Sequence, residues 1–528
     1  MTYDYAKLQN GSDIRGVASP VLGNTVNLDA EAAGSLARGF CYLLNVRDGV
    51  PFDGMTVAVG RDSRVTGPAL AEAVCSALSS CGIKVFDCGM ASTPAMFMST
   101  VFPEYDADGA IMITASHMPM DRNGLKFFGR GGGLEKRDIT DIINFAESNS
   151  ILGQLPRGAG PVEKRDLIDT YSAHLRDLIC EGVASALQTP LSCMLGPSIV
   201  NPGLPPFDPD KPLAGLRITV DAGNGAGGFY AGKVLEPLGA DVSSSRFLEP
   251  DGTFPNHIPN PENREAMDSI REAVKAAGTD LGIIFDTDVD RASAVDENGR
   301  EIAHNGIVAM AAALIADDHP GTTVVTDSVT SRHLTEFLEK DLGLKHLRYK
   351  RGYRNVIGKS IELNEQGIDS ELAIETSGHA AYRENYFLDD GAYLATRIVI
   401  KTALLKAQGK GISSVVANLA EAAESKEARL PISGEDFGET AGRMIAEITN
   451  LVASGNLKGC TLEEPNYEGV RINFNAPSIR GWMLLRKSLH DPIIPVNMEA
   501  DVPGGVAEMV RIITPILMGY PEIDISKL

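Results

Sequence analysis

The chain has 528 residues, of which 43% are hydrophobic and 22% are charged. A chain of this length and apolar content folds into several domains and is not intrinsically disordered. Its 70 acidic and 48 basic residues give a formal net charge of -22, which repels nucleic-acid phosphates and anionic membrane surfaces. We therefore expect no nucleic-acid and no membrane partner, and an anionic substrate would need locally gathered Arg and Lys.

Cysteine usage and hydropathy indicate a reducing, aqueous environment. The seven cysteines are scattered, odd in number and without the paired spacing of a metal site. Residues 1–16 lack the pattern of a signal peptide, and no apolar run approaches the roughly 20 residues that span a bilayer. We expect the cytoplasm or a reducing organelle stroma. The sequence does not determine the oligomeric state.

Short β-rich apolar runs alternate with helical patterns, which predicts βαβ units around largely parallel sheets. The Pro-rich stretch at residues 189–212 reads as a hinge, and softer boundaries lie at residues 320–321 and 431–435. The predicted domains are 1–205, 206–319, 320–430 and 431–528. The predicted strands are 55–59, 84–88, 110–113, 216–221, 281–285, 322–326 and 481–485, and the predicted helices are 67–81, 262–277 and 331–342.

A serine follows the predicted strand that ends at residue 113. It lies in the segment T-A-S-H-M-P at residues 114–119, and N-G-L-K follows at 123–126. Ser116 is thus predicted at the carboxyl end of a strand, where open α/β sheets usually bind ligands. Serine is a poor nucleophile until a neighbour takes its proton, and His117 and Lys126 are candidates for that role. The alternative is a polar loop whose side chains only satisfy turn hydrogen bonds.

A glycine-rich segment, G-N-G-A-G-G at residues 223–228, follows the predicted strand 216–221 and has the spacing of a dinucleotide-binding turn. Asp221 and Asn224 place polar side chains where a pyrophosphate needs bare backbone. We therefore favour a structural strand-to-helix turn over a nucleotide site.

Three aspartates, Asp286, Asp288 and Asp290, follow the apolar run at residues 281–285. Neighbouring carboxylates do not all stay ionised unless a cation offsets them, and hard oxygen ligands suit Mg²⁺. A solvated acidic turn is disfavoured because the apolar run holds the loop against the sheet. An Asp-x-Asp after a strand is also how haloacid-dehalogenase-type phosphatases present a nucleophilic aspartate, so this motif alone leaves both interpretations open.

Two later segments are weaker signals. E-T-S-G-H at residues 375–379 offers a carboxylate and a hydroxyl for sugar hydroxyls. R-K-S-L-H-D-P at residues 486–492 follows a predicted strand and gathers cations that suit a phosphate. A solvated hairpin is an equally good interpretation of the second segment.

Taken in this order, the four segments resemble the α-D-phosphohexomutase superfamily, with its phosphoserine, metal, sugar and phosphate loops. S-D-I-R-G at residues 12–16 and G-R-D-S-R at 60–64 resemble the two amino-terminal signatures of that superfamily. The resemblance covers nearly the whole chain. It implies three related mixed α/β domains and a smaller α+β carboxy-terminal domain around a central cleft, with one loop from each domain reaching the substrate.

The resemblance also implies a role for each matching residue. Ser116 corresponds to the phosphorylated nucleophile that also faces the metal, and Arg291 to the residue that steadies the metal loop. The implied Mg²⁺ ligands are Asp286, Asp288 and Asp290. Residues that assist proton transfer or polarise the reacting groups are Arg15, His117, Lys126 and His379. Those implied to bind the sugar and the non-reacting phosphate are Glu375, Ser377, Arg486, Ser488 and His490.

The implied substrates are hexose 1-phosphate and hexose 6-phosphate, with a hexose 1,6-bisphosphate intermediate. The segment F-P-N-H-I-P-N-P at residues 254–261 resembles the one typical of phosphoglucomutases and phosphomannomutases. No residue decides between glucose and mannose. Other interpretations are a phosphatase that uses Asp286 and a catalytically weak sugar-phosphate-binding protein on the same scaffold.

The sequence departs from the superfamily pattern in the phosphate loop. Leu489 and His490 stand where a small residue and a threonine are usual. His490 would carry positive charge mainly below neutral pH, so one hypothesis is a weaker phosphate grip and appreciable release of hexose 1,6-bisphosphate. The alternative is that Arg486, Lys487 and Ser488 suffice because arginine binds phosphate strongly.

Overall fold

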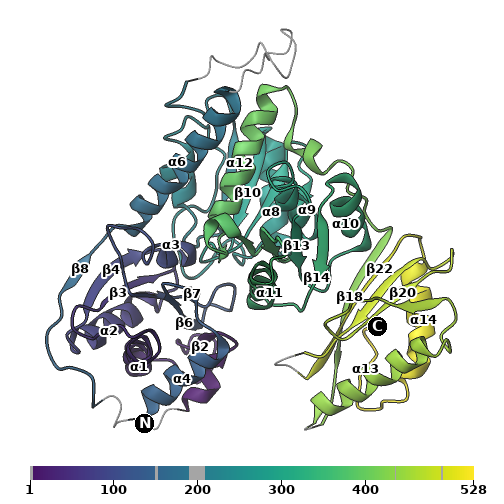
Figure 1. Cartoon of the computed structure of the whole chain (residues 1–528), viewed down its shortest axis with the longest axis horizontal. Coiled ribbons are helices and arrows are strands. Elements are labelled where there is room, and N and C mark those ends of the chain that lie inside the picture. Colours follow the sequence, from purple (N-terminus) through teal and green to yellow (C-terminus); the bar gives the residue numbers. More distant parts are fainter. Residues whose placement is uncertain (1–3, 149–152, 189–207, 435, 489–491) are drawn as a thin grey trace. The chain divides into compact units, whose positions relative to one another are not determined.

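The computed structural model describes residues 4–148, 153–188, 208–434, 436–488 and 492–528. The chain divides into two compact units, each built from two stretches of sequence (Figure 1). The first unit comprises Met1–Ala303 and Ser377–Val415, and the second comprises His304–Thr376 and Val416–Leu528. The short turn η5 (Ile412–Val416) lies where the chain passes from the first unit into the second.

The amino-terminal part of the first unit contains a mixed β-sheet. Its strands are β1 (Gln9–Asn10), β2 (Asp13–Val17), β3 (Thr56–Arg61), β4 (Lys84–Met90), β5 (Gly109–Ile113), β6 (Arg122–Gly129), β7 (Gly132–Gly133) and β8 (Val162–Lys164). The order is β1-β2-β6-β5-β3-β4-β8, and β7 pairs with β6. Strands β5, β3, β4 and β8 are parallel, whereas β6 is antiparallel to β5 and to β2. The ends of β3 and β5 therefore meet at one edge.

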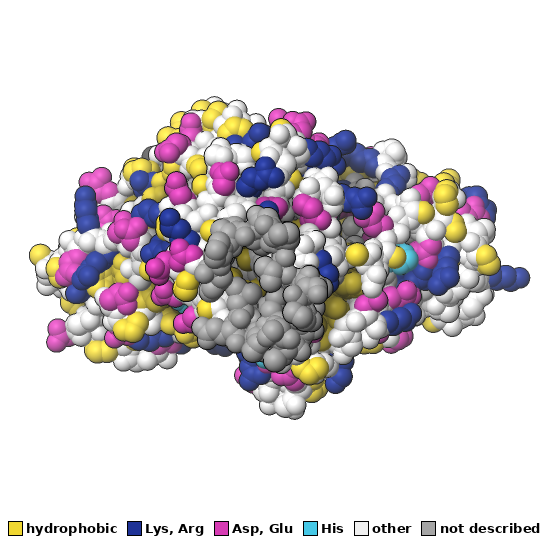
Figure 2. All heavy atoms as spheres, turned by 90° about the horizontal axis from the view of Figure 1, so that it is seen from above, with side chains coloured by type: hydrophobic (Ala, Val, Ile, Leu, Met, Phe, Trp, Pro, Cys, Tyr) yellow, Lys and Arg dark blue, Asp and Glu magenta, His cyan; other side chains and the backbone are white. Residues whose placement is uncertain are grey.

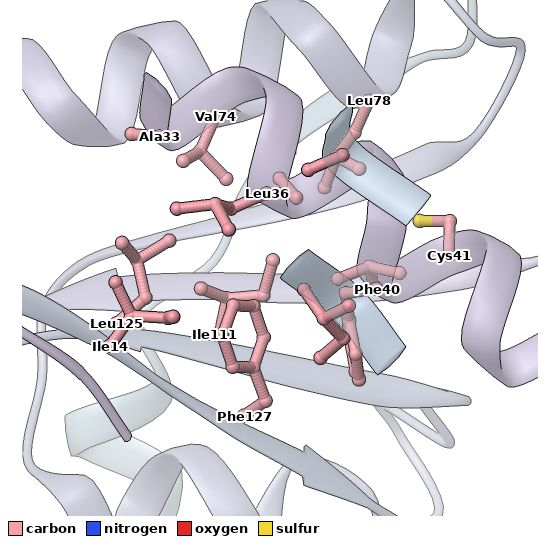
Figure 3. Packing of buried hydrophobic residues seen from close by; sticks show 14 of the residues in the cluster. Ile14, Ala33, Leu36, Phe40, Cys41, Val74, Leu78, Ile111, Leu125 and Phe127 are labelled. Atoms are coloured by element: carbon pink, nitrogen blue, oxygen red, sulfur yellow. The ribbon is translucent and has the colours of Figure 1, made fainter. Parts of the chain in front are cut away.

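The core of this sheet includes residues of the helices η1 (Tyr5–Leu8), α1 (Ala30–Asp48), α2 (Gly67–Ser79) and α4 (Lys136–Glu147). Helix α3 (Thr93–Met98) also contacts the sheet, whereas α6 (Leu167–Gln188) packs mainly on other helical elements of the first unit. Figure 3 shows Leu36 and Phe40 of α1 facing Ile111 and Phe127 of the sheet. Alternate residues of a strand share a face, so the apolar residues of β5 and β6 on this side pack under α1. This packing fixes the strand ends that carry the candidate site.

A second sheet in the first unit carries the aspartate loop. Its strands are β9 (Ile218–Asp221), β10 (Leu281–Phe285), β11 (Ala292–Asp296) and β12 (Glu301–Ile302), in the order β12-β11-β10-β9. Strands β9 and β10 are parallel, and β10 and β11 form an antiparallel hairpin. The neighbouring helical elements are η2 (Tyr230–Leu235), a π-helical turn, and α8 (Arg264–Ala277) and α12 (Gly391–Ala407), which pack on β10. The first unit also contains the antiparallel strands β16 (Ala380–Tyr382) and β17 (Leu388–Asp389), joined by η4 (Arg383–Asn385).

The second unit begins with parallel strands. β13 (Thr323–Thr326) pairs with β14 (Lys345–Arg348) and with β15 (Leu372–Ile374). The accompanying helices are α9 (Asn305–Ala313), α10 (Arg332–Glu336), η3 (Phe337–Asp341) and α11 (Tyr353–Glu365). The predicted helix 331–342 is thus present as α10 continued by the π-helical turn η3.

The carboxy-terminal part of the second unit is an antiparallel α+β fold. Its strands are β18 (Glu424–Pro431), β19 (Cys460–Leu462), β20 (Val470–Phe474), β21 (Gly481–Leu485) and β22 (Ile493–Ala500), in the order β18-β22-β21-β20-β19. Helices α13 (Phe437–Ala453) and α14 (Gly505–Leu517) pack on it. Met509, Ile513 and Leu517 recur every four residues, which places them on one face of α14, and all three are buried in this core.

The surface carries many charged side chains. Acidic and basic side chains are interspersed over the face shown in Figure 2. Among the helices that the structure describes, none combines the length and the apolar character needed to cross a membrane. The described cysteines, which exclude Cys193, are all free thiols. Most of the predicted hinge, residues 189–207, lies outside the described residues.

Candidate active site

Ser116 lies just beyond the end of β5, as predicted, and is only 3% exposed. Its Oγ donates a hydrogen bond to Asp286 Oδ2 at 3.0 Å and accepts one from Arg291 Nη2 at 3.1 Å. The fold thus brings together a serine and an aspartate that are 170 residues apart in the chain. The hydroxyl sits between a carboxylate and a guanidinium, which suits a group that gains and loses a phosphoryl.

His117 is the immediate neighbour of this hydroxyl. Its Nδ1 lies 3.3 Å from Ser116 Oγ and accepts a hydrogen bond from Arg291 Nη2 at 2.8 Å. Burial, followed by the charges of Arg291 and Arg15, lowers the pKa of His117 to about 3. The imidazole is therefore neutral near pH 7, with its lone pair on Nδ1, because a guanidinium only donates.

Arg15 and Lys126 come from adjacent strands, since Arg15 of β2 faces Gly124 of β6 in the ladder. Arg15 Nη1 donates to the carbonyl of Ala115 at 3.0 Å. Lys126 Nζ forms ion pairs with Asp290 and, at 3.3 Å, with Asp288. Both predicted cations therefore lie beside the serine loop or the aspartate loop.

The three aspartates occupy the turn between β10 and β11 and are all buried. One carboxylate oxygen from each lies within 4.8 Å of the others. Asp288 Oδ1 and Asp290 Oδ1 are buried without a hydrogen-bond partner. Buried carboxylate oxygens of this kind fit a hard divalent cation, so the residues present suit Mg²⁺. This burial excludes the solvated acidic turn, the alternative that the sequence already disfavours.

The pKa values of two of these carboxyls move in opposite directions. Burial, reinforced by the charge of Asp290, raises the pKa of Asp286 well above its usual value. Burial also opposes ionisation of Asp290, but Lys126 and then His379 and Arg291 outweigh it and lower that pKa. Carboxyls whose pKa values are shifted in opposite directions are characteristic of functional sites.

Two neighbouring segments hold the aspartate loop in place. Thr93 donates its backbone N–H and its hydroxyl to the carbonyl and the carboxylate of Asp288, at 2.8 and 2.5 Å. A Cβ on Gly225 would lie 2.8 Å from the carbonyl oxygen of Thr287, and the adjacent Ala226 N–H donates to that same carbonyl. The glycine-rich segment at 223–228 therefore serves close packing against the aspartate loop.

The predicted sugar segment, residues 375–379, is divided between the two units. Residues 375–376 belong to the second unit and residues 377–379 to the first. Ser377 Oγ is 2.8 Å from His379 Nδ1, and His379 Nε2 lies 3.7 Å from Asp290 Oδ1. Gly378 has φ of 92°, and a Cβ there would be 2.5 Å from the carbonyl oxygen of Ala292. His379 thus joins the aspartate loop, and burial lowers its pKa well below the usual value.

In the second unit, Glu375 and Arg486 are the main predicted residues. Glu375 Oε1 accepts a hydrogen bond from the backbone N–H of Gly352 at 2.7 Å. Arg486 follows β21, and its Nε is buried without a hydrogen-bond partner. Burial, and then the charge of Arg351, lowers the pKa of Arg486. Arginine suits phosphate because its guanidinium donates two parallel hydrogen bonds to phosphate oxygens.

Two other predicted residues of the phosphate loop carry less information. Ser488 is described and follows β21 by three residues. His490 and its neighbour Leu489 lie outside the described residues, so the hypothesis of a weakened phosphate grip stays a prediction.

Comparison with known proteins identifies the family. Three family models match successive parts of the chain, namely phosphoglucomutase/phosphomannomutase α/β/α domains I, II and III, at residues 6–150, 207–299 and 304–422. The chain belongs to this family. A phosphoglucomutase/phosphomannomutase of Thermococcus kodakarensis is 30% identical over 453 residues, which cover 84% of this chain and 86% of the relative.

Other relatives agree with this membership. A phosphomannomutase/phosphoglucomutase of Pseudomonas aeruginosa is 29% identical over 532 residues, covering 99% of this chain and 97% of the relative. The crystal structure of a phosphoglucomutase/phosphomannomutase family protein from Burkholderia thailandensis has a TM-score of 0.74 and 26% identity, and covers 97% of both chains. The predicted α/β fold and the predicted superfamily are therefore confirmed.

Sequence reasoning missed Arg64 and Thr93 as parts of the candidate site. Arg64 is buried and donates to backbone carbonyls of the serine loop, although in the sequence it stands out only as part of a signature. The signal that would have found it is the pair of oppositely charged residues, Asp62 and Arg64, directly after a buried strand. Thr93 carries no such signal, because its contact with Asp288 depends on the packing of α3.

Proposed function

We propose that this protein is a phosphohexomutase that interconverts hexose 1-phosphate and hexose 6-phosphate, with glucose, mannose or both as the sugar. The observation that carries this proposal is the position of the Ser116 hydroxyl, 3.0 Å from Asp286 Oδ2 in a buried trio of aspartates. A binding protein has no need for a nucleophile opposite a metal site. Family membership supports the same reaction.

In this proposal Ser116 carries the phosphoryl group, and the first unit supplies the groups around it. Arg291 and Arg15 donate hydrogen bonds to the serine loop and offset the negative charge of the phosphate. Lys126, His117 and His379 assist proton transfer or polarise the reacting oxygen. Phosphoryl transfer depends mainly on positioning and charge neutralisation, and these side chains provide both.

Asp286, Asp288 and Asp290 are the proposed ligands of Mg²⁺. When bound, Mg²⁺ would neutralise negative charge on the phosphoryl group. The protein's own contribution is the buried loop between β10 and β11, which Arg291 braces through hydrogen bonds from Nε and Nη2 to Asp286 Oδ2 at 3.1 and 3.0 Å.

The second unit supplies the proposed recognition groups. Glu375, together with Ser377 of the first unit, would accept hydrogen bonds from sugar hydroxyls. Arg486, Ser488 and His490 would hold the phosphate that does not react. Phosphate contacts of this kind bind either end of a hexose bisphosphate equally, which a mutase requires.

The proposed reaction proceeds in two steps. The bond from Ser116 Oγ to phosphorus breaks as a sugar hydroxyl oxygen bonds to the same phosphorus; the proton of that hydroxyl passes to a base of the site, and Ser116 Oγ takes up a proton. The product is hexose 1,6-bisphosphate. After this intermediate turns over, Ser116 Oγ gives its proton to a base as it bonds to the other phosphorus. The bond from that phosphorus to the sugar oxygen breaks, and the released oxygen takes up a proton.

Ser116→Ala tests this proposal directly. We expect the parent to convert glucose 1-phosphate or mannose 1-phosphate to the 6-phosphate with catalytic glucose 1,6-bisphosphate and Mg²⁺, and Ser116→Ala to lose this turnover with an unchanged circular dichroism spectrum. Ser99→Ala is the matched control, since Ser99 is a buried serine at the end of α3 whose hydroxyl donates to the carbonyl of Met96. A Ser116→Ala protein that retains more than a small fraction of turnover would refute the mechanism.

A further inference from the structure

The backbone of Ser116 is held in an unfavourable conformation. Its φ is 48°, in the left-handed region that residues other than glycine, asparagine and aspartate rarely adopt. Strained backbone of this kind persists only where the surrounding structure over-determines it, and it is concentrated at active sites. The contacts around the peptide groups of Ser116 identify what holds it.

Arg64 holds the carbonyl side of the serine loop. Its Nη2 donates to the carbonyls of Ser116 and Met118 at 2.5 and 2.6 Å, and its Nη1 donates to those of Pro119 and Arg122 at 2.8 Å each. The side chain is 1% exposed. One planar guanidinium therefore fixes four successive points of the loop, which a lysine ammonium with its single nitrogen does not reproduce.

Thr114 holds the amide side of Ser116. Its Oγ1 accepts a hydrogen bond from the Ser116 N–H at 2.9 Å and donates one to Asp62 Oδ2 at 2.7 Å. Asp62 Oδ1 accepts the Arg64 N–H at 2.9 Å, and Asp62 Oδ2 lies 3.4 Å from Arg64 Nε. A single buried carboxylate thus links the group that holds the N–H of Ser116 to the group that holds its carbonyl.

A loop that follows β9 covers this network. The ring of Phe254 lies 5.5 Å from the guanidinium carbon of Arg64. A Cβ on Gly252 would lie 2.4 Å from the carbonyl oxygen of Ser63, so that segment packs tightly over residues 63–65. Water is excluded from the network, and hydrogen bonds to charged groups are stronger where water is excluded.

We propose that Arg64 and Thr114, joined by Asp62, are positioning residues that set the backbone of Ser116 and so direct its Oγ toward Asp286 and Arg291. The proposal rests on the proposed role of Ser116 as phosphoryl carrier. None of the three side chains needs to touch the sugar, since Arg64 and Thr114 bond to the backbone of the serine loop and Asp62 accepts hydrogen bonds from Thr114 and Arg64. Their loss should therefore affect the rate of transfer and leave substrate binding nearly intact.

The sharpest test is the pair Thr114→Val and Thr114→Ser. Valine keeps the shape of threonine but cannot accept the Ser116 N–H, whereas serine keeps the hydroxyl. A displacement of about 1 Å in a reacting group costs on the order of 100-fold in rate, so we expect Thr114→Val to lower kcat by roughly 10- to 100-fold with KM for hexose phosphate unchanged within about twofold. Thr114→Ser should stay within about threefold of the parent.

Arg64→Lys is the second variant, with Arg61→Met as its control. Arg61 is the last residue of β3, three positions before Arg64; it is partly exposed, and its guanidinium donates to the carbonyl of Asp62. We expect Arg64→Lys to lower kcat and slow phosphorylation of Ser116 by glucose 1,6-bisphosphate, followed by intact mass, while Arg61→Met does neither. Circular dichroism and thermal melting establish whether each variant is folded. If Arg64→Lys is not folded, the comparison of Thr114→Val with Thr114→Ser tests the proposal by itself.

The two proposals fail in different ways. A parent protein without mutase turnover overturns the proposed function. An active parent whose Thr114→Val variant keeps kcat within about threefold, or loses binding and not kcat, overturns the positioning role. Equal losses in Thr114→Val and Thr114→Ser would also overturn it, because the hydroxyl would then have no part in the effect.

Discussion

Most candidate site residues of this chain lie at the ends of strands, and many of them could be recognised from sequence. Ser116 and the three aspartates follow apolar strands, and the parallel edges of α/β sheets make such positions accessible to ligands. The charged pair Asp62 and Arg64 after a buried strand marks Arg64 as a candidate, but its contacts could not be predicted, because its four acceptors are backbone carbonyls.

The aspartate loop allows a test at the scale of one residue. Asp288→Asn removes one anionic ligand, and charge count tunes the affinity of such sites. We expect the Mg²⁺ concentration for half-maximal activity to rise roughly tenfold or more, equivalent to at least about 1.4 kcal/mol, and excess chelator to stop the parent enzyme. The measurement is a Mg²⁺ titration of the mutase rate.

Asp296→Asn is the control for this titration. Asp296 is a buried aspartate in the same hairpin, but its Oδ1 accepts the backbone N–H groups of Asn298 and Arg300. Its Mg²⁺ requirement should match that of the parent. Equal requirements in all three proteins, or full activity in excess chelator, would contradict the metal role of the loop.

At the scale of elements, most predicted strands and helices are present, and differences fall at their ends. Residues 281–285 and 481–485 form β10 and β21 with the predicted bounds. The predicted helix 67–81 ends at Ser79. Periodicity of apolar residues defines the middle of an element, whereas its ends depend on capping and on tertiary contacts.

The start of α12 carries a buried carboxylate that the sequence did not reveal. Both Asp390 oxygens accept a hydrogen bond from the Tyr171 hydroxyl of α6 at 2.6 Å. Burial raises the pKa of Asp390 to about 6, although the hydrogen bond from Tyr171 opposes this. The unfolded value is about 3.9, so the folded chain holds this proton more tightly, and this carboxyl makes stability fall as the pH rises from about 4 to about 6.

Tyr171→Phe should therefore lower the free energy of unfolding more at high pH than at low pH. The hydroxyl stabilises the ionised carboxylate, and loss of such a hydrogen bond costs about 1–3 kcal/mol. We expect a larger decrease in the urea midpoint at pH 7.5, where Asp390 is ionised, than at pH 5, where it is protonated. Tyr230→Phe is the matched control, since Tyr230 is a buried tyrosine that contacts the neutral hydroxyl of Thr396. A Tyr171→Phe effect that is the same at both pH values would refute the assignment.

At the scale of the whole molecule, the chain divides in a way that sequence did not predict. Residues 377–415 belong to the first compact unit although residues 304–376 before them belong to the second. Tertiary contacts determine that residues 377–415 return to the first unit. One of these contacts is the β-bridge between Arg291 and His379. The four-domain division at residues 205, 319 and 430 stays a prediction.

Substitutions in the second unit should change KM for hexose phosphate more than they change phosphorylation of Ser116. Arg486 belongs to the second unit, and a hydrogen bond to a charged group is worth about 1.5–3 kcal/mol, so Arg486→Gln should raise KM for hexose phosphate about 10- to 100-fold with a smaller effect on Ser116 phosphorylation. Arg480→Gln is the control, since Arg480 is exposed and pairs with Asp501. Similar KM values for both variants would exclude Arg486 from phosphate binding.

The central claim is that Ser116 carries the phosphoryl group, and the most direct measurement is the location of that group on the protein. The purified chain would be incubated with glucose 1,6-bisphosphate and Mg²⁺, quenched in acid, digested and mapped by mass spectrometry, with hydroxylamine treatment of a parallel sample to detect acyl phosphates. We predict an acid-stable, hydroxylamine-resistant phosphate on the peptide containing Ser116. A hydroxylamine-sensitive phosphate on the peptide containing Asp286, with Ser116 unmodified, would contradict the account and indicate a phosphatase.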